Sequence, residues 1–418
     1  MRGFLIALLA AGSLPAAGAA DRPSGAVRIA TFNSSLNRSV DGGLRHDLST
    51  TDDLQARAVA EIIQRVRPDI LLLQEFDFDV DGIALRDFQA NYLARPQHGE
   101  RAIAYEFTFS APSNTGVPSG FDLDGDGKIG GGGDALGFGE FPGQYGMVLL
   151  SRFPIERGQV RTFRRFLWRD MPGALLPDNP DTSYPSDWYS ADALALLPLS
   201  SKSHWDVPVR IGRLTLHILA SHPTPPAFDG PEDRNGLRNH DEIRFWNDYL
   251  TAANAGYIHD DRGKSGGFRS GAFVTMGDQN SDPVDGGSRN DAIRALLAHP
   301  RVDSSFVPQS AGAPEAAAAQ GGANATQKGD PRFDTADFND RVAGNLRVDY
   351  LLPSKGLKLC GGGVFWPAQA AAAARLVWGD KPPPSSDHRL VWIDINAGAA
   401  RCPPGSDPTA SASSHPGR

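Results

Sequence analysis

Residues 272–282, AFVTMGDQNSD, place a group of polar side chains directly after a short apolar run. The apolar part predicts a buried strand that ends near Gly277, because short apolar runs bounded by turn residues are typical of such strands. Asp278 and Asn280 then follow at a point where a rigid sheet can hold polar groups in fixed positions. A glycine–aspartate turn that simply ends the strand explains this stretch equally well.

Four other strand-like runs end in polar side chains, and a fifth carries an aspartate inside it. The runs cover residues 28–33, 69–75, 214–222, 385–394 and 347–352, and their polar side chains are Asn33, Glu75, His222, Asp387, His388 and Asp349. Ions such as Mg²⁺ prefer carboxylate and amide oxygens, and phosphoester hydrolysis also needs a base and donors for developing negative charge. Each residue alone has an ordinary explanation as a cap or a turn, but together they indicate one site.

The spacing of apolar residues predicts an α/β protein. A strand at 26–33, an amphipathic helix at 53–67 and a buried strand at 69–75 follow one another closely, which predicts helices layered on a sheet. We expect a hairpin of 207–211 with 213–220 about Gly212, and helices at 239–253 and 290–297. The stretches near 76–143 and 161–205 are interpreted as insertions in one domain spanning 26–398. The Ala- and Gly-rich segment 310–329 is expected to lack regular structure.

The two ends of the chain have different compositions from the rest. Residues 1–20 resemble a secretory signal peptide, and no later run is long and apolar enough to span a bilayer. We therefore expect a secreted or periplasmic protein. In an oxidising compartment Cys360 and Cys402 are expected to form a disulfide. Residues 399–418 are rich in Ser, Pro and Gly and are expected to be disordered.

Seven short segments of the sequence, taken in chain order, resemble the endonuclease/exonuclease/phosphatase superfamily. The pieces are TFN at 31–33, LQE at 73–75, MVLLSRFP at 147–154, SH at 221–222, GDQN at 277–280, RVDYLL at 347–352 and SDH at 386–388. The resemblance implies a four-layer α/β sandwich, with two mixed β-sheets packed face to face and helices outside. It also implies a phosphoric ester hydrolase that uses Mg²⁺ or Mn²⁺ and cleaves phosphodiester, or phosphomonoester, bonds by metal-assisted attack of water.

The resemblance further implies roles for metal ligands and for a catalytic histidine. Glu75 would be the principal metal ligand, supported by Asn33, and Asp387 would be a second or alternative ligand. His388 would be the catalytic histidine, oriented by Asp349 through its other ring nitrogen.

Three more residues acquire roles in handling water and phosphate. Asp278 would align or deprotonate the attacking water, Asn280 would hold a phosphate oxygen, and His222 would bind the phosphate. Whether the histidine or the aspartate acts as the base stays open. The chain departs from the family at Gln279, where an aromatic residue is usual.

The segment 231–241, PEDRNGLRNHD, would lie beside the same cleft. Arg234 or Arg238 is a candidate clamp for a second phosphate oxygen. A capped helix start with solvated charges is the alternative.

A separate motif at 122–129, DLDGDGKI, resembles the first half of an EF-hand calcium loop. The usual glutamate at position twelve is replaced by Gly133, with Asp134 next. We expect a structural Ca²⁺, and an acidic glycine turn is the alternative. The candidate residues are Asp122, Asp124, Asp126, Lys128 and Asp134.

Taken together, these features predict a secreted, metal-dependent phosphoesterase, most consistent with a phosphodiesterase. The formal net charge of −8 does not provide the excess of positive charge that non-specific nucleic-acid binding uses. A small phosphoester is therefore favoured over long duplex DNA. An extracellular nuclease is the alternative; its candidate basic and aromatic track is Arg164, Arg165, Trp168 and Arg169. A catalytically silent, Ca²⁺-stabilised binding module is the alternative of another class, and the complete set of histidines and acids argues against it. No protein partner is predicted.

Overall fold

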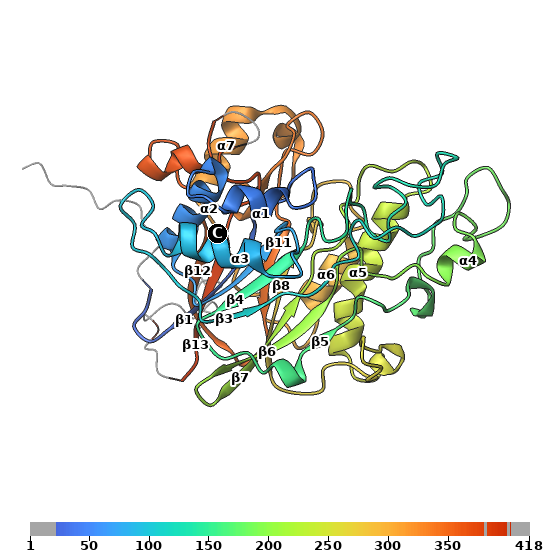
Figure 1. The fold of residues 1–418 in the computed structure, drawn as a ribbon, viewed down its shortest axis with the longest axis horizontal. Helices are drawn as coiled ribbons and strands as arrows, with labels where there is room; N and C mark the ends of the chain where they lie inside the picture. Colours follow the sequence, from blue (N-terminus) through green and yellow to red (C-terminus); the bar gives the residue numbers. More distant parts are fainter. Residues whose placement is uncertain (1–21, 380–382, 399–401, 403–418) are drawn as a thin grey trace, which may run out of the picture.

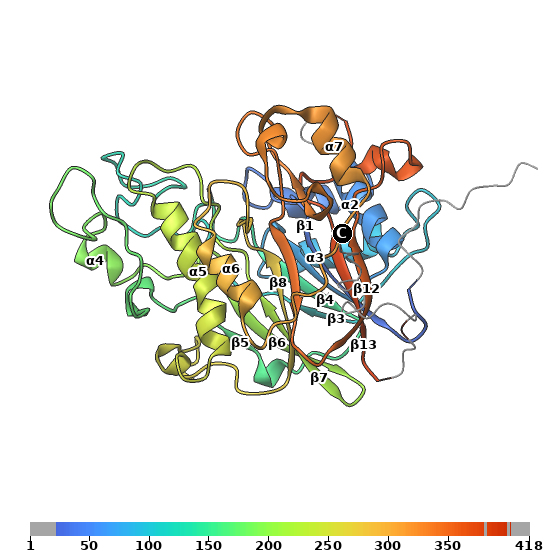
Figure 2. The same cartoon turned by 180° about the vertical axis from the view of Figure 1, so that it is seen from behind.

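Two mixed β-sheets pack face to face at the centre of the molecule, with helices on their outer sides (Figures 1 and 2). The computed structural model describes residues 22–379, 383–398 and 402. The predicted four-layer α/β sandwich is therefore confirmed. The signal peptide expected at 1–20 and the tail expected from 399 lie outside the described residues, apart from Cys402.

The first sheet has six strands in the order β12-β13-β1-β2-β4-β3, and the second has five in the order β11-β8-β7-β6-β5. The strands of the first sheet are β1 Val27–Asn33, β2 Ile70–Gln74, β3 Phe107–Phe109, β4 Met147–Ser151, β12 Lys358–Val364 and β13 Val391–Asn396. Those of the second are β5 Arg161–Thr162, β6 Trp205–Ile211, β7 Leu214–Ala220, β8 Ala272–Asp278 and β11 Asp349–Pro353. A two-stranded ladder joins β9 Ala336–Asp337 to β10 Asn345–Leu346. The pairs β1–β2 and β7–β8 are parallel, and the other strand pairs are antiparallel.

Helices cover both outer faces, with α5 and α6 on the second sheet and α1, α2 and α3 near the first (Figure 1). The helices are α1 Gly43–Leu48, α2 Leu54–Val66, α3 Ile83–Phe88, α4 Ala191–Leu194, α5 Arg234–Leu250, α6 Asp291–Ala298 and α7 Gly312–Gln320. A π-turn covers Gln89–Leu93, and 3₁₀ turns cover Arg157–Gln159, Trp168–Asp170, Ala255–Tyr257, Gly322–Thr326, Pro331–Phe333 and Ala372–Leu376.

Alternating side chains of the second sheet divide between two apolar cores. Val274 joins the core between the sheets, whereas its neighbour Phe273 joins the core beneath α5, which contains Ile243 and Trp246. Successive residues of a strand point to opposite faces, so one apolar run serves both layers. This burial on both faces explains why the central strands are continuously hydrophobic.

Several predicted elements agree with the structure. Helix α2 begins where the Asp53 side chain accepts the Ala56 amide at 2.7 Å, and it ends at Arg67 before Pro68. The hairpin of β6 and β7 turns at Gly212, whose φ of 59° lies in the left-handed region. Helix α5 begins five residues earlier than expected.

The prediction that residues 310–329 lack regular structure was wrong. Helix α7 lies there because alanine favours helix, and its small residues allow close packing: a Cβ on Gly312 would lie 2.4 Å from the Pro367 carbonyl oxygen. The insertions also carry regular structure, since β3 pairs with β4 and β5 pairs with β6 at the sheet edges. Composition alone concealed these elements because their stability comes from tertiary contacts.

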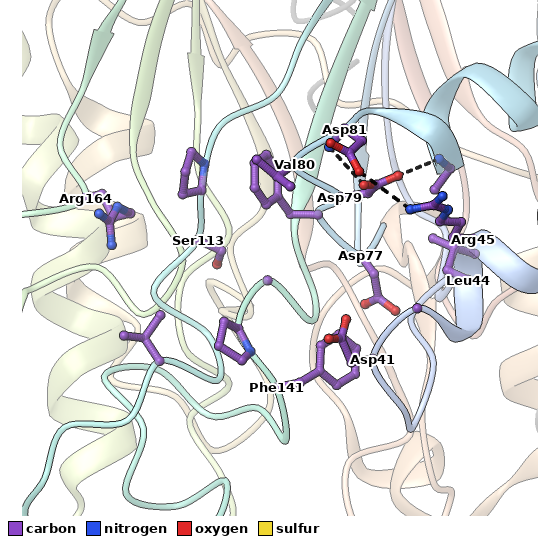
Figure 3. A pocket seen from close by; sticks show the side chains of 17 residues that line it. Asp41, Leu44, Arg45, Asp77, Asp79, Val80, Asp81, Ser113, Phe141 and Arg164 are labelled. Carbon is purple, nitrogen blue, oxygen red and sulfur yellow. Dashed lines mark hydrogen bonds and ion pairs between the residues drawn. The ribbon is translucent and has the colours of Figure 1, made fainter.

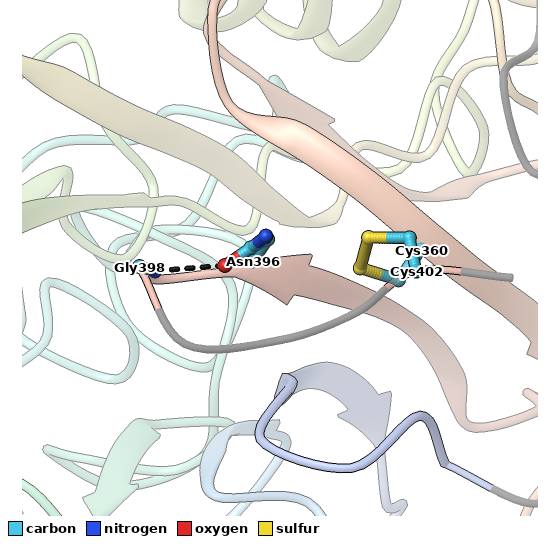
Figure 4. The surroundings of a disulfide bond; sticks show 4 residues. All are labelled: Cys360, Asn396, Gly398 and Cys402. Atoms are coloured by element: carbon cyan, nitrogen blue, oxygen red, sulfur yellow. Dashed lines mark hydrogen bonds between the residues drawn. A yellow bond between two sulfur atoms is a disulfide. The ribbon is translucent and has the colours of Figure 1, made fainter.

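The predicted disulfide joins Cys360 in β12 to Cys402, with an S–S distance of 1.99 Å (Figure 4). It attaches the chain after β13 back to the neighbouring edge strand. In the parts of the chain that the structure describes, the helices are too short or too polar to cross a membrane.

Candidate active site

The polar side chains meet where strands from both sheets end at the same edge. The parallel pairing of β1 with β2 aligns Asn33 with Gln74, so that Asn33 and Glu75 emerge together. In the second sheet, antiparallel pairing places Asp349 opposite Asp278. The Asn33 amide nitrogen bridges the sheets, because it lies 3.0 Å from Glu75 Oε1 and 3.1 Å from Asp278 Oδ2.

Asp278 is the centre of this arrangement and is almost completely buried. Its Oδ2 lies 3.4 Å from His222 Nε2 and 3.6 Å from His388 Nε2. Its Oδ1 accepts the backbone N–H of Asn280 at 2.8 Å, which fixes the turn in which Asn280 takes a φ of 50°. A left-handed backbone is uncommon for a residue other than glycine and concentrates at functional sites.

His388 is held by a second carboxylate on its other ring nitrogen. Nδ1 lies 2.9 Å from Asp349 Oδ2, and both side chains are buried. The backbone N–H of His388 donates to Ser386 Oγ, and this hydroxyl donates in turn to the Asn33 carbonyl oxygen at 2.8 Å. These contacts fix the ring between Asp349 and Asp278, so Nε2 is directed to the centre of the site.

The charges in this cluster stabilise one another. Burial favours the neutral form of Asp278, but His388 and His222, with a hydrogen bond from Asn33, lower the pKa of the Asp278 carboxyl below its ordinary value. Burial also opposes the charge on His388, yet Asp349 and Asp278 raise the pKa of the imidazole well above its usual value. Burial raises the pKa of Asp349. These interactions therefore favour the carboxylate form of Asp278 and the imidazolium form of His388.

Glu75 and Asp387 fit the role of metal ligands. Both are half-buried, and Glu75 accepts single hydrogen bonds from Asn33 at 3.0 Å and from Asn37 at 2.8 Å, which leaves carboxylate lone pairs free. Ser35 Oγ donates to Asp387 Oδ1 at 3.3 Å. Hard divalent ions take such oxygens. Asn33 presents its amide nitrogen to Glu75, so its amide would have to turn to offer oxygen to an ion.

Lys202 is a buried cation, missed by sequence reasoning, whose charge interacts with carboxylates of the site. It is 6% exposed, and its ammonium makes no hydrogen bond or ion pair with the residues that the structure describes. Burial lowers the pKa of Lys202, whereas Glu242, Glu75 and Asp278 raise it, which places its charge near the cluster. A single lysine in the serine-rich stretch before β6 carries no motif, so no sequence signal marked it.

The two arginines predicted as phosphate clamps have other partners. Arg238 is buried and donates to the carbonyl oxygens of Leu136, Pro198 and Leu199 at 2.7 to 2.9 Å. Arg234 pairs with Glu232. These contacts indicate that Arg238 attaches both insertions to α5 and is not available to a substrate.

The basic and aromatic track considered for a nuclease is not continuous on the surface. Trp168 is fully buried and donates its Nε1 to Asp241 at 2.8 Å. Arg164 donates to Asn114 at 3.2 Å, while Arg165 and Arg169 are exposed. The aromatic member is therefore unavailable for stacking on a base.

A pocket of about 440 Å³ is lined on one side by Asp77 (Figure 3). Its lining is formed by residues of 41–45, 77–84, 112–117 and 141–143 together with Arg164. Asp77, two residues after Glu75, accepts the backbone N–H groups of Arg38 at 2.8 Å and Tyr145 at 3.1 Å. Burial raises the pKa of Asp77 to about 7, and the nearby Glu75 charge adds to this effect. The pocket therefore adjoins the candidate metal ligand.

The acidic loop in the first insertion brings Asp122, Asp124 and Asp126 together, with carboxylate oxygens within 4.8 Å of one another. Gly133 leaves no room for a side chain at position twelve, because a Cβ there would lie 2.0 Å from Asp124 Oδ2. The buried Asp134 instead closes the loop by accepting the N–H groups of Leu123 and Gly130.

The exposed Lys128 donates its backbone N–H to Asp126 Oδ1 at 2.8 Å, so it also stabilises the turn. The expected Ca²⁺ stays a prediction, since these contacts fit a metal loop and a metal-free acidic turn alike.

Comparison with known proteins decides the family. The model of the Endonuclease/Exonuclease/phosphatase family matches residues 30–388. The chain belongs to this family. The resemblance inferred from the sequence pieces is thereby confirmed, and the protein is an enzyme of the metal-dependent phosphoric ester hydrolase class.

Several solved structures align over most of the chain. An endonuclease/exonuclease/phosphatase from Beutenbergia cavernae is 16% identical with a TM-score of 0.46, covering 90% of this chain and 72% of that one. Sphingomyelinase C from Streptomyces griseocarneus is 16% identical with a TM-score of 0.43, covering 89% and 99%. Truncated TDP2 from Caenorhabditis elegans is 16% identical with a TM-score of 0.39, covering 88% and 97%. A search of curated protein sequences found no match.

Proposed function

We propose that this family member is a secreted phosphodiesterase that hydrolyses a small phosphoester with the help of Mg²⁺ or Mn²⁺. The observation that carries the proposal is the buried Asp278 carboxylate, with His222, His388 and Asn33 around one of its oxygens. A binding protein gains nothing from such a set of opposed, buried charges, whereas a hydrolase needs a proton acceptor beside proton donors.

Asp278 is the group that accepts a proton from water in this proposal. Its lowered pKa keeps it ionised, whereas His388 is kept protonated by Asp349 and Asp278. A protonated imidazole cannot act as a base, so His388 donates from Nε2 to the charge that develops on phosphate oxygens. This assigns the base, which the sequence left open, to the aspartate.

The remaining groups bind and orient the phosphate. The buried ammonium of Lys202 and the ring of His222 supply donors. Asn280, whose backbone N–H binds Asp278 and whose Nδ2 donates to the Pro223 carbonyl oxygen at 3.1 Å, has a second amide hydrogen for a phosphate oxygen. A divalent ion on Glu75 and Asp387, with Asn33, would supply Lewis-acid stabilisation of the phosphate charge. Apart from Lys202, these are the roles that the family resemblance implies for these residues.

The pocket that Asp77 lines supports a small substrate with an organic substituent. Its lining includes Leu44, Val80 and Phe141, and the carboxylates of Asp41 and Asp77 face one another across it (Figure 3). Asp79 and Asp81 also line the pocket, so its four acidic side chains outnumber its two basic ones, Arg45 and Arg164. This acidic excess disfavours a further phosphate of a nucleic-acid strand but not an apolar substituent. The pocket therefore favours a compact ester over a polynucleotide.

The test is an assay of the purified chain with Mg²⁺, Mn²⁺, Ca²⁺ or EDTA. Bis(p-nitrophenyl) phosphate, p-nitrophenyl phosphate and plasmid DNA distinguish a diesterase, a monoesterase and a nuclease. We expect metal-dependent hydrolysis of the diester, lost in His388→Ala and in Glu75→Ala. Preferential cleavage of plasmid DNA would favour the nuclease, and folded protein without turnover on any substrate would favour the binding module.

A further inference from the structure

Helix α5 buries five consecutive polar residues, 238–242, of sequence RNHDE. Each is at most 9% exposed, and Asn239, Asp241 and Glu242 are 0% exposed. Successive residues of a helix point about 100° apart, so five in a row face every direction. An ordinary surface helix buries one stripe of apolar residues instead. This segment is therefore enclosed on all sides and must satisfy its polar groups internally.

The outer contacts of this segment attach the second insertion. Asp241 Oδ2 accepts Trp168 Nε1 at 2.8 Å and the Leu175 N–H at 2.7 Å. Arg244 donates to Asp241 Oδ1 at 3.1 Å. Asp241 thus has a structural role at a distance from the catalytic cluster.

The inner contacts are made by Glu242 and Asn239 and reach the catalytic loops. Glu242 Oε1 accepts the Ser201 N–H at 2.7 Å, and Oε2 accepts the Thr224 N–H at 2.6 Å. Asn239 Nδ2 donates to the carbonyl oxygens of Thr224 at 2.8 Å and Gln279 at 3.0 Å. Both backbone polar groups of Thr224 are therefore bound by this one helix.

These three backbone positions adjoin the groups that would act on the substrate. Thr224 follows His222 by two residues, Gln279 stands between Asp278 and Asn280, and Ser201 precedes Lys202. Two buried side chains of α5, Glu242 and Asn239, thus form hydrogen bonds to the backbone of three loops. These loops come from separate parts of the chain, so their own local sequences cannot bring them together.

We propose that Glu242 is a positioning residue for phosphoester hydrolysis, which holds the His222 loop and the Lys202 segment together through the N–H groups of Thr224 and Ser201 and places a buried negative charge next to that segment. The inference rests on the proposed function. It deepens that function by adding a residue that touches no substrate and acts through two that do.

The charge of Glu242 matters to Lys202 because, among the residues that the structure describes, no carboxylate forms an ion pair with the ammonium. Burial lowers the pKa of Lys202, and the charges acting on it are Glu242, Glu75 and Asp278, which raise it, and Arg238, which lowers it. Glu242 exerts the largest effect of the three carboxylates. Without it, Lys202 would lose its proton at a lower pH and with it the ability to donate to phosphate.

The experiment compares pH–rate profiles for bis(p-nitrophenyl) phosphate in Mg²⁺ between wild type, Glu242→Gln and a matched control, Asp241→Asn. Both changes replace a fully buried carboxylate of α5 by its amide. We expect Glu242→Gln to lower kcat/KM by about 10- to 100-fold and to move the basic limb of the profile to lower pH. Asp241→Asn should lower the melting temperature and leave the basic limb in place.

Two further variants separate charge from structure. Glu242→Asp keeps the charge, so it should restore the basic limb even if kcat stays reduced. In a Lys202→Arg background, where the cation does not titrate near neutral pH, Glu242→Gln should no longer shift the limb. If Glu242→Gln does not fold, the basic limb of the pH–rate profile is compared in Lys202→Arg and Glu242→Asp alone. A limb that moves in Lys202→Arg and stays at the wild-type position in Glu242→Asp supports the role of the Glu242 charge.

The outcomes also distinguish this inference from the proposed function. Wild type without metal-dependent turnover overturns the proposed function. If wild type is active and the basic limb lies at the same pH in Glu242→Gln and in Asp241→Asn, the role of Glu242 is overturned. A limb that Lys202→Arg leaves unchanged overturns the link through Lys202.

Discussion

Two clusters of acidic residues in this protein have opposite surroundings. Asp278 at the end of β8 and Asp349 at the start of β11 are buried around His388, whereas Asp122, Asp124 and Asp126 lie in a largely exposed loop of the first insertion. In the buried cluster each charge depends on side chains from distant strands, such as His222 and Asn33.

In the loop each carboxylate accepts backbone N–H groups only two to five residues away. Asp122 accepts those of Gly125 and Gly127, and Asp124 accepts that of Asp126. Proximity of carboxylates alone therefore says little about chemistry. What differs is how each negative charge is compensated: by opposed charges in the buried cluster, and by the local backbone and solvent in the loop.

The largest expected effect is on activity, from one amide substitution in each cluster. Asp278→Asn removes the proton acceptor and should lower kcat/KM by about 10²- to 10⁴-fold, measured with the chromogenic diester in Mg²⁺. Asp124→Asn should leave kcat/KM unchanged, since the loop touches no catalytic group. Equal losses in the two variants would contradict the contrast between the clusters.

Asp349→Asn should have a smaller effect with a characteristic pH signature. Asp349 raises the pKa of His388, so removing its charge lowers that pKa and moves the loss of the imidazolium to lower pH. We expect kcat/KM to fall by about 10- to 100-fold at neutral pH and to recover partly under acidic conditions. A profile parallel to that of wild type would show that Asp349 does not act through His388.

The pH dependence of stability should also reveal the buried cluster. Because the folded pKa of His388 is raised, its contribution is fully present below the unfolded value of about 6.5 and is lost as pH rises through the folded value. The difference in unfolding free energy between wild type and His388→Ala should therefore shrink from pH 6 to pH 10. Urea unfolding in EDTA measures it, and a difference that grows with pH would contradict this assignment.

The smallest expected effect concerns the loop. If it binds Ca²⁺ with a Kd of about 1 mM, 10 mM Ca²⁺ should stabilise the fold by about 1.4 kcal/mol relative to EGTA. Asp124→Ala should abolish that gain and change stability in EGTA by less than about 1 kcal/mol. Melting curves that do not respond to Ca²⁺ in either protein would identify the loop as a metal-free acidic turn.

Much of the site was predictable because strand ends are local features. Asn33, Glu75 and Asp278 stand at the ends of apolar runs, and His388 stands just before the apolar run of β13. The strand pairing that aligns Asn33 with Gln74 and Asp278 with Asp349 follows from the sandwich. Lys202 and Glu242 were not predictable in this way. Their importance lies in burial and in contacts with residues far away in the chain, and neither leaves a local pattern.

The partners of arginine side chains could not be predicted from the sequence either. Arg238 stands in a segment expected beside the cleft, yet its guanidinium binds three carbonyl oxygens of the two insertions. Arg389, which follows His388, likewise donates to Asp337 and to the carbonyl oxygens of Ser386 and Val377. Residue type indicates what an arginine can bind, but only packing decides whether a protein carbonyl or a substrate is its partner.

By itself, the sequence determined the strands, the main helices and the set of polar residues at strand ends, because hydrophobic periodicity and turn residues act over a few positions. Only the tertiary structure decided which of those polar groups lie in hydrogen-bonding or ion-pair contact, that helix α7 forms in an alanine-rich segment, and that buried side chains of α5 bind the backbone of three separate loops. The physical reason is that desolvation and charge interactions depend on neighbours from distant parts of the chain, which come together only when both sheets and α5 have packed.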